Sequence, residues 1–243
     1  MARIFITGSA DGLGHLAAQH LVHQGHRVVL HARNTRRGQD ALHKVPDAET
    51  VLTADLSNLE EIRRLASEVN ELGQFDAVIH NAGIYQASSH QLFTVNTLAP
   101  YVLTCLINQP GRLIYLSSGM HLHGDPSLTK IQAQRTSYSD TKLHLVILAK
   151  AVARQWTGTY SNAVDPGWVP TKMGGRGAPD SLEQGYLTQA WLAVSDENQA
   201  HVSGCYFYHQ KQERYARVAD DIPVQDGLIA YCAQVTGVSF PSG

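Results

Sequence analysis

The sequence is poor in cysteine and has almost no net charge. Only three cysteines occur among 243 residues (Cys105, Cys205 and Cys232), and their odd number and wide spacing exclude a disulfide framework and favour a reducing compartment. A formal net charge of −2 excludes an overall basic excess that would attract nucleic acid or an anionic membrane. Any anionic ligand must therefore be held by local groups.

Long apolar runs are also missing. No stretch reaches the roughly 20 apolar residues that cross a bilayer, so the sequence predicts no membrane span. Met1 leads directly into a strand-like run at Ile4–Thr7, without the apolar region and cleavage site of a signal peptide. We therefore expect a cytoplasmic protein.

No repeat, low-complexity tract or linker divides the chain, so we expect one domain over residues 1–243. Short runs rich in β-branched residues alternate with helical segments, which predicts an α/β fold of the Rossmann type: a doubly wound parallel sheet of about seven strands with helices on both faces. The predicted strands are Ile4–Thr7, Arg27–His31, Thr50–Thr53, Phe75–His80, Leu113–Ser117, Thr159–Val164 and Cys205–Tyr208. The predicted helices are Leu13–Gln24, Thr35–Lys44, Leu59–Leu72, Gln91–Asn108, Tyr138–Trp156 and Leu182–Val194.

Two segments, 119–137 and 166–181, do not fit this alternation. Both follow the carboxyl ends of predicted strands, where open α/β sheets bind their ligands. We interpret them as the substrate loops.

A glycine-rich turn joins the first predicted strand to the first predicted helix. Gly8, Gly12 and Gly14 are spaced as Gly-x3-Gly-x-Gly, which lets the backbone approach a pyrophosphate while the helix N-terminus faces its charge. A simple tight turn is the alternative for such a motif taken alone. Its position in a βαβ pattern favours a dinucleotide site.

The end of the second strand bears on the choice of cofactor. An acidic residue there usually binds the ribose of NAD, but this chain has Ala32 followed by Arg33, whose guanidinium can pair with a 2′-phosphate. NADP(H) is therefore favoured, with NAD(H) as the alternative. Asp11 in the glycine loop argues against NADP(H), because its carboxylate would repel that phosphate, and Arg33 is alternatively an ordinary exposed loop residue.

Seven motifs in order make the chain resemble the short-chain dehydrogenase/reductase family in its compact, single-domain form. They are Thr7–Gly14, Asp55, Asn81-Ala82-Gly83, Asn96, Ser117-Ser118, Tyr138-Ser139-Asp140-Thr141-Lys142 and Asp165–Thr171. The resemblance implies a catalytic set of Asn96, Ser118, Tyr138 and Lys142, with Ser117 as the alternative serine. It also implies a cofactor site formed by Gly8, Ser9, Asp11, Gly12, Leu13, Gly14, Arg33, Asn34, Asp55, Leu56, Asn81, Ala82, Gly83, Tyr138, Lys142, Pro166, Gly167, Val169 and Thr171.

Tyr138 and Lys142 are four residues apart, so on a helix they share one face. An ammonium next to a phenol favours the phenolate and lowers the pKa of the tyrosine from about 10 toward working pH. The pair can then exchange a proton with a carbonyl or alcohol oxygen, while a nicotinamide exchanges the hydride. Ser118 could hydrogen-bond the same oxygen.

Pro100 lies four residues after Asn96 and has no N–H, so the carbonyl of Asn96 lacks its helical partner. We hypothesise that a water bound there relays protons to Lys142. A kinked packing helix without catalytic meaning is the alternative.

The sequence says less about the substrate and the partners than about the cofactor site. The Ser-Ser-x-x-His pattern at Ser117–His121 and the strand at Cys205–Tyr208 are similar to the branch of retinol dehydrogenases and protochlorophyllide reductases. A pocket lined by Tyr85, His121, His123, Trp168 and Met173 suggests a hydrophobic ketone or aldehyde.

The helices predicted at Gln91–Asn108 and Tyr138–Trp156 are apolar nearly all round, and in the resembling family they form dimer interfaces, so we expect a homodimer or homotetramer. The spacing of His20, His23 and His26 indicates a solvated helix face, and we expect no metal site. The rival function is a catalytically silent NADP-binding regulatory protein. An extended-branch epimerase or dehydratase is disfavoured by the glycine spacing and the short C-terminal region.

Overall fold

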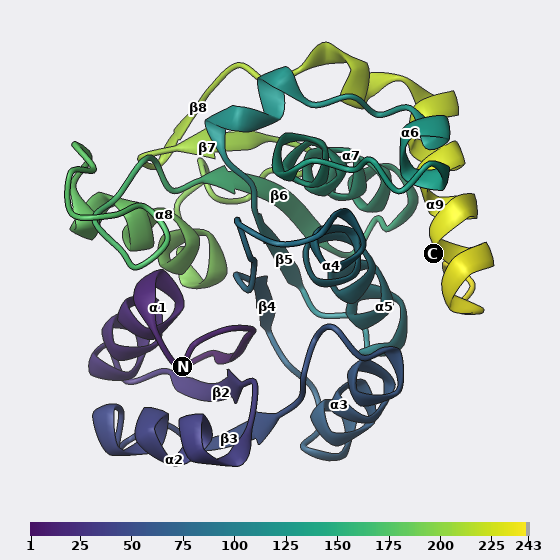
Figure 1. Ribbon diagram of the computed structural model, residues 1–243. Helices are drawn as coiled ribbons and strands as arrows, with labels where there is room; N and C mark the ends of the chain where they lie inside the picture. Colours follow the sequence, from purple (N-terminus) through teal and green to yellow (C-terminus); the bar gives the residue numbers. More distant parts are fainter. Residues whose placement is uncertain (242–243) are drawn as a thin grey trace.

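An eight-stranded sheet runs through the middle of the computed structural model, which describes residues 1–241 (Figure 1). The strand order is β3-β2-β1-β4-β5-β6-β7-β8, in which β1 to β7 are parallel and β8 is antiparallel to β7. The predicted Rossmann-type sheet is thus confirmed, and β8 extends it at one edge. The strands are β1 (Arg3–Ile6), β2 (Arg27–Ala32), β3 (Thr50–Thr53), β4 (Ala77–His80), β5 (Arg112–Leu116), β6 (Tyr160–Asp165), β7 (Tyr206–Tyr208) and β8 (Lys211–Gln212).

Helices cover both faces of the sheet (Figure 1). On one face lie α1 (Gly12–His23), α2 (Thr35–Lys44) and α8 (Leu182–Val194), and on the other lie α3 (Leu59–Glu71), α5 (Ala99–Leu106), α7 (Tyr138–Gln155) and α9 (Ile222–Thr236). The short helices are α4 (Ser89–Phe93) and α6 (Leu128–Gln132), with a π-helix η1 (Thr94–Leu98) and 3₁₀ turns η2 (Gly119–His123) and η3 (Arg217–Asp220). Within residues 1–241, no helix combines the length and apolar character needed to cross a membrane.

The fully buried first strand shows why the sheet needs two helical layers. Ile4, Phe5 and Ile6 are all 0% exposed. Because successive strand residues point to opposite faces, Phe5 packs into the core under α3, α5 and α7, while Ile4 and Ile6 pack into the core under α1 and α8. A continuous apolar run is typical of a parallel strand covered on both sides.

The single helix predicted over Gln91–Asn108 is wrong in detail, because the segment forms α4, η1 and α5 in succession. Pro100 stands at the start of α5. The preceding N–H, that of Ala99, bonds five residues back to the carbonyl of Thr94, the wider spacing of a π-helix. The proline therefore interrupts the helix, as its missing N–H requires.

Helix α9 was not predicted, and it changes the interpretation of the apolar helices. It packs on α7, and most residues of α5 and α7 are buried within the one chain. The chain after α9 continues this cover: the Tyr101 hydroxyl donates to the Val238 carbonyl over 2.8 Å, and the Trp156 indole N–H donates to the Pro241 carbonyl over 3.2 Å. These contacts bury, within one chain, much of the apolar surface from which we expect a homodimer or homotetramer.

The substrate loop 119–137 is built around one buried carboxylate. Asp140, in the first turn of α7, accepts hydrogen bonds from the backbone N–H groups of Ser137 (2.7 Å) and Asp125 (2.8 Å). It also forms an ion pair with Lys130 over 2.7 Å, and its side chain is 1% exposed. The loop, which contains η2 and α6, is thereby fixed to the helix that carries Tyr138.

Candidate active site

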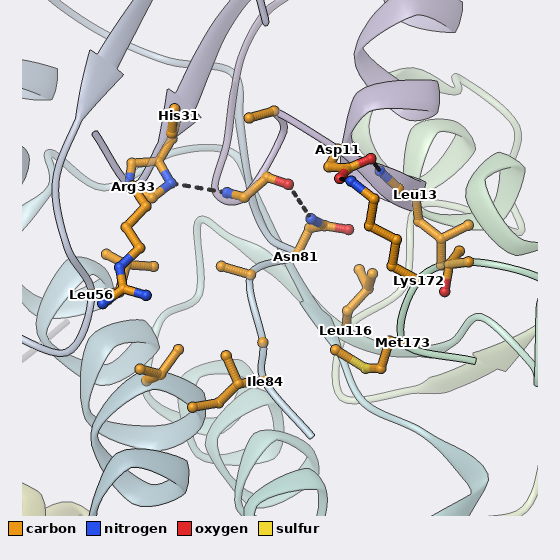
Figure 2. Close-up of a pocket in the computed structure, with 18 of the residues that line it drawn as sticks. Asp11, Leu13, His31, Arg33, Leu56, Asn81, Ile84, Leu116, Lys172 and Met173 are labelled. Carbon is orange, nitrogen blue, oxygen red and sulfur yellow. Dashed lines mark hydrogen bonds and ion pairs between the residues drawn. The ribbon is translucent and has the colours of Figure 1, made fainter. Parts of the chain in front are cut away.

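A long groove crosses the carboxyl ends of the central strands, at the side where the order reverses between β1 and β4 (Figure 2). Such a switch point is where open α/β sheets bind ligands. Of the predicted site residues, the groove brings together Gly8, Asp11, Gly12, Leu13, Arg33, Asp55, Leu56, Asn81, Ala82, Gly83, Tyr138, Lys142, Pro166 and Thr171.

The glycine loop packs directly against the chain that leaves β4. A Cβ atom on Gly8 would lie 2.9 Å from the Cα atom of Ala82, and one on Gly14 would lie 2.3 Å from the Asn81 amide nitrogen. That amide donates to the carbonyls of Thr7 (2.9 Å) and Gly8 (3.2 Å). Gly12 has φ +57 and its Cβ position is open, with Thr171 as the nearest neighbour at 4.0 Å. The backbone thus leaves a shallow cradle at the N-terminus of α1.

The buried side chain of His31 holds this glycine loop in place. Its Nδ1 atom accepts the Gly8 N–H over 2.9 Å (Figure 2), and its Nε2 atom lies 3.1 Å from the Ala54 carbonyl. Burial lowers the pKa of His31 to about 4, so the ring is neutral at pH 7 and Nε2 carries the proton that is donated to Ala54. His31 therefore connects the glycine loop to the end of β3 as a neutral ring and adds no charge to the groove.

Arg33 and Arg37 line the groove near the end of β2, and a third basic side chain, Lys172, lines it from the loop after β6. Arg33 pairs with Asp55 over 2.7 Å. Arg37, in the first turn of α2, lies 3.7 Å from Asp11, and the ammonium of Lys172 pairs with the same oxygen of that carboxylate (Figure 2). The hydrogen bond from Lys172 holds the pKa of Asp11 below its ordinary value. The acidic residue in the glycine loop is therefore already neutralised by two cations.

Tyr138 lies at the opposite end of the groove, at the start of α7. Its hydroxyl points to the sulfur of Met173 over 4.0 Å, and its ring meets the ring of Tyr85 edge-on with centroids 4.9 Å apart. Burial raises the pKa of Tyr138 above its ordinary value, and the nearby Ser118 hydroxyl opposes that rise. The tyrosine is thus held in its protonated form, in reach of Ser118.

Lys142 does not lower the pKa of Tyr138 in the way that we expected. Its ammonium lies 5.3 Å from the centroid of the Tyr138 ring and donates instead to the Leu116 carbonyl over 2.7 Å. Burial lowers the pKa of Lys142 itself to about 8, opposed by the charge of Asp165. Lys142 is therefore mostly charged at pH 7 and loses its proton as the pH rises through about 8.

The two serines after β5 have separate surroundings. Ser117 is buried, lines the groove and donates its hydroxyl to the Lys142 carbonyl over 2.8 Å. Ser118 is half-buried and does not line the groove, and its hydroxyl accepts the Met120 N–H over 3.3 Å and lies near Tyr138. The assignment of Ser118 as the catalytic serine, with Ser117 as the alternative, stays a prediction.

Asn96 is buried and does not line the groove. Its side chain brackets the backbone of Ile84, accepting the N–H and donating to the carbonyl, both over 2.9 Å, and also donates to the Thr141 hydroxyl over 3.1 Å. It thus fixes the exit of β4 against α7. The water relay at its carbonyl stays a prediction.

Several other predicted residues support the groove without lining it. Ser9 is 0% exposed and donates inward to Ile6, Asn34 caps α2, and Gly14 packs on Asn81. Gly167 and Val169 likewise lie behind the surface of the groove.

Of the suggested substrate pocket, Tyr85 and Met173 lie beside Tyr138 and Trp168 is exposed. His121 does not line a pocket: it is 0% exposed, and its two ring nitrogens bond to the Ser118 carbonyl (2.7 Å) and the Ala216 N–H (3.2 Å).

Sequence reasoning missed Arg37 and Lys172. Arg37 had a recognisable signal, because it lies in the first helical turn after the strand that ends at Ala32. Lys172 is 161 residues from Asp11 in the chain, and no spacing rule relates the two. Among residues 1–241, no cluster of three or more histidine, cysteine or acidic side chains is placed to hold a metal ion.

Comparisons with known proteins show the family to which the chain belongs. The model of the short chain dehydrogenase family matches residues 2–181. An uncharacterized oxidoreductase of Emericella nidulans is 46% identical and the short-chain dehydrogenase chyC of Penicillium rubens is 39% identical, each over 100% of both chains.

Two solved structures share the fold. One from Mycobacterium Paratuberculosis has a TM-score of 0.80 at 23% identity and covers 99% of this chain and 95% of that chain. The other, a blue fluorescent protein from a metagenomic library in complex with NADPH, has a TM-score of 0.71 at 20% identity, with 85% and 95% covered.

The predicted nearness to retinol dehydrogenases is wrong. Retinol dehydrogenase 13 of Homo sapiens is only 27% identical, over 98% of this chain and 86% of its own, and is more distant than the fungal oxidoreductases. The protein is a member of the short-chain dehydrogenase/reductase family whose similar curated relatives include fungal oxidoreductases.

Proposed function

We propose that the protein transfers a hydride between NADP(H) and a carbonyl or alcohol substrate, with Tyr138 as the acid and base. The observation that carries this proposal is one groove with two unlike ends. Arg33 and Arg37 gather positive charge at one end, and the protonated Tyr138 hydroxyl and Lys142 lie at the other.

The residues present fit a dinucleotide phosphate. The cradle formed by Gly8 and Gly12 faces the N-terminus of α1, whose first N–H groups have no helical partner and favour a pyrophosphate. Arg33 and Arg37 suit a 2′-phosphate, and the groove offers no unpaired acid for the ribose of NAD, since Asp11 and Asp55 are already paired with cations. The NADPH complex of the structurally similar blue fluorescent protein supports the same choice. NAD(H) is the alternative.

The chemistry assigned to the chain is proton transfer and positioning. A bound nicotinamide supplies the hydride in reduction. The Tyr138 hydroxyl then gives its proton to the substrate oxygen, and Ser118 hydrogen-bonds that oxygen as charge develops on it. Lys142, with its pKa near 8, holds a second proton behind the tyrosine. Asn96 links the chain after β4 to α7 and so positions Tyr138 and Lys142.

The substrate end favours an apolar carbonyl compound. Tyr85 packs on the Tyr138 ring and Met173 lies at its hydroxyl. The two large side chains are 41% and 48% exposed, so a hydrophobic ketone or aldehyde would cover apolar surface that is costly to leave in water.

A paired measurement tests the proposal. Binding of NADPH and NADH is measured by calorimetry, and NADPH oxidation is then followed with panels of apolar aldehydes, ketones and quinones. We expect tighter binding of NADPH and turnover with one of the apolar classes. Tight NADPH binding with no turnover across the panels would instead support the silent regulatory protein.

A control variant tests the charge at the nucleotide end. Arg33→Ala should weaken NADPH binding about tenfold, the size of a lost charge-assisted contact, and leave NADH binding nearly unchanged. An unchanged ratio of the two affinities would contradict the assignment of NADP(H).

A further inference from the structure

We propose that Lys172, on the substrate loop 166–181, is a ligand of the cofactor phosphates and that the bound cofactor thereby holds this loop over the groove. The inference rests on the proposed NADP(H) function. No other residue of the loop brings a positive charge into the groove, where Pro166, Thr171 and Met173 are its remaining lining residues.

The ammonium of Lys172 lies where a phosphate of the cofactor would bind. Its side chain extends from the loop across the groove to Asp11, at the N-terminus of α1 (Figure 2). Both this helix end and the cradle beside Gly12 face the same space. An anion bound at the N-terminus of α1 is therefore within reach of both Lys172 and the backbone N–H groups of that helix end.

The Asp11 carboxylate interacts with two cations that could instead bind an anionic ligand. One of its oxygens, Oδ2, contacts Lys172 and also lies 3.7 Å from Arg37, while the other accepts the Gly12 N–H over 2.9 Å. The Lys172 side chain is 87% exposed and that of Arg37 is 49% exposed, so both can turn toward a ligand without breaking a buried contact. A dianionic phosphate competes well with one carboxylate for such cations.

Because Asp11 is paired with cations, its carboxylate no longer argues against NADP(H) as the cofactor. An unpaired carboxylate in the glycine loop would repel a phosphate, but this one gathers positive charge from two separate segments, the start of α2 and the substrate loop. The residue next to Lys172 is Met173, which touches the Tyr138 hydroxyl. Binding of phosphate by Lys172 would thus fix the position of the side chain that bounds the substrate end.

The test is a binding measurement that does not depend on turnover. Affinities for NADPH and NADH are measured by calorimetry for wild type, Lys172→Ala and Lys172→Arg. Arg176→Ala is the matched control, because Arg176 is an exposed cation on the same loop that does not line the groove.

We expect Lys172→Ala to weaken binding about tenfold and Lys172→Arg to restore most of it, with Arg176→Ala within about twofold of wild type. Weakening confined to NADPH assigns the 2′-phosphate, and equal weakening of NADPH and NADH assigns the pyrophosphate. Unchanged affinity for both cofactors in Lys172→Ala would overturn the inference.

A double-variant cycle separates a phosphate ligand from a merely structural ion pair. Asp11→Asn keeps an N-cap for α1 but removes the partner charge of Lys172. If Lys172 binds phosphate, Lys172→Ala still weakens NADPH binding in the Asp11→Asn background. If that effect disappears there, Lys172 acts only through Asp11 and the inference is wrong. Should wild type bind neither cofactor, the proposed NADP(H) function fails instead.

Discussion

At the scale of single residues, Ser117 and Ser118 show how adjacent side chains of one type can have different tasks. Ser117 is a buried donor to the Lys142 carbonyl, and the Ser118 hydroxyl lies near Tyr138. We expect Ser118→Ala to lower kcat about 100-fold, the cost of removing one donor from a developing oxyanion, with little change in NADPH affinity. Ser117→Ala should keep most of kcat and lower the free energy of unfolding by about 1 kcal/mol. Steady-state kinetics and urea unfolding of both variants check this, and the reverse assignment of effects would contradict it.

Lys142 is a residue at which function and stability conflict. Burial lowers its pKa from 10.5 to about 8, so the folded protein bears the cost of an enclosed ammonium at neutral pH. We expect Lys142→Met to lose activity and to raise the free energy of unfolding at pH 7 by about 1–3 kcal/mol, less than the full shift implies because the hydrogen bond to Leu116 is lost.

The pH dependence gives the sign of this effect. Between pH 8 and 10.5 the unfolded chain still binds the proton that folded Lys142 has released, so wild-type stability rises with pH over that interval. The stability difference between Lys142→Met and wild type should be full below pH 8 and vanish as the pH approaches 10.5. Urea unfolding at several pH values measures it, and a variant less stable than wild type at pH 7 would refute the argument.

At the scale of elements, the start of α7 is set by Asp140. Its carboxylate caps the helix through Ser137 and fixes loop 119–137 through Asp125 and Lys130. Burial by itself would raise the pKa of Asp140, but these contacts outweigh it and the pKa is lowered. We expect Asp140→Asn to lower the free energy of unfolding at pH 7 by about 1–3 kcal/mol.

The advantage of wild type over Asp140→Asn should depend on pH in a defined direction. Because the folded pKa is depressed, the stabilisation is present above the unfolded pKa of about 3.9 and is lost as the pH falls through the lower folded value. Unfolding curves at pH 7 and in acid measure this. An equal difference between the two proteins at both pH values would show that the charge of Asp140 is not responsible.

The sequence predicted most of the elements and failed where tertiary packing decides. The seven parallel strands and the glycine turn follow from local patterns of β-branched residues and from fixed spacings. The apolar residues of α5 and α7 were visible too, but whether α9 or a second subunit covers them depends on where α9 folds back. In the same way, the pairing of Lys172 with Asp11 joins segments 161 residues apart and leaves no local signal.

At the scale of the whole molecule, the cover that α9 and residues 237–241 provide predicts a monomer. Light scattering should give a mass near 26.6 kDa. A chain ending at Thr236 loses the contacts of Val238 and Pro241, which exposes Tyr101 and Trp156, and it should be less stable and self-associate. A wild-type dimer that joins through α5 and α7 would contradict this reading.

The central claim is that one tyrosine moves the substrate proton in an NADP(H)-dependent reaction. Its most direct test is kcat for wild type and Tyr138→Phe with the best carbonyl substrate, together with NADPH affinity measured on the same preparations. The variant keeps the ring that packs on Tyr85 and removes only the hydroxyl. We predict that kcat falls by about 1,000-fold, within the usual range for a lost acid catalyst, while NADPH affinity stays within about twofold of wild type. Equal kcat in the two proteins would contradict the account.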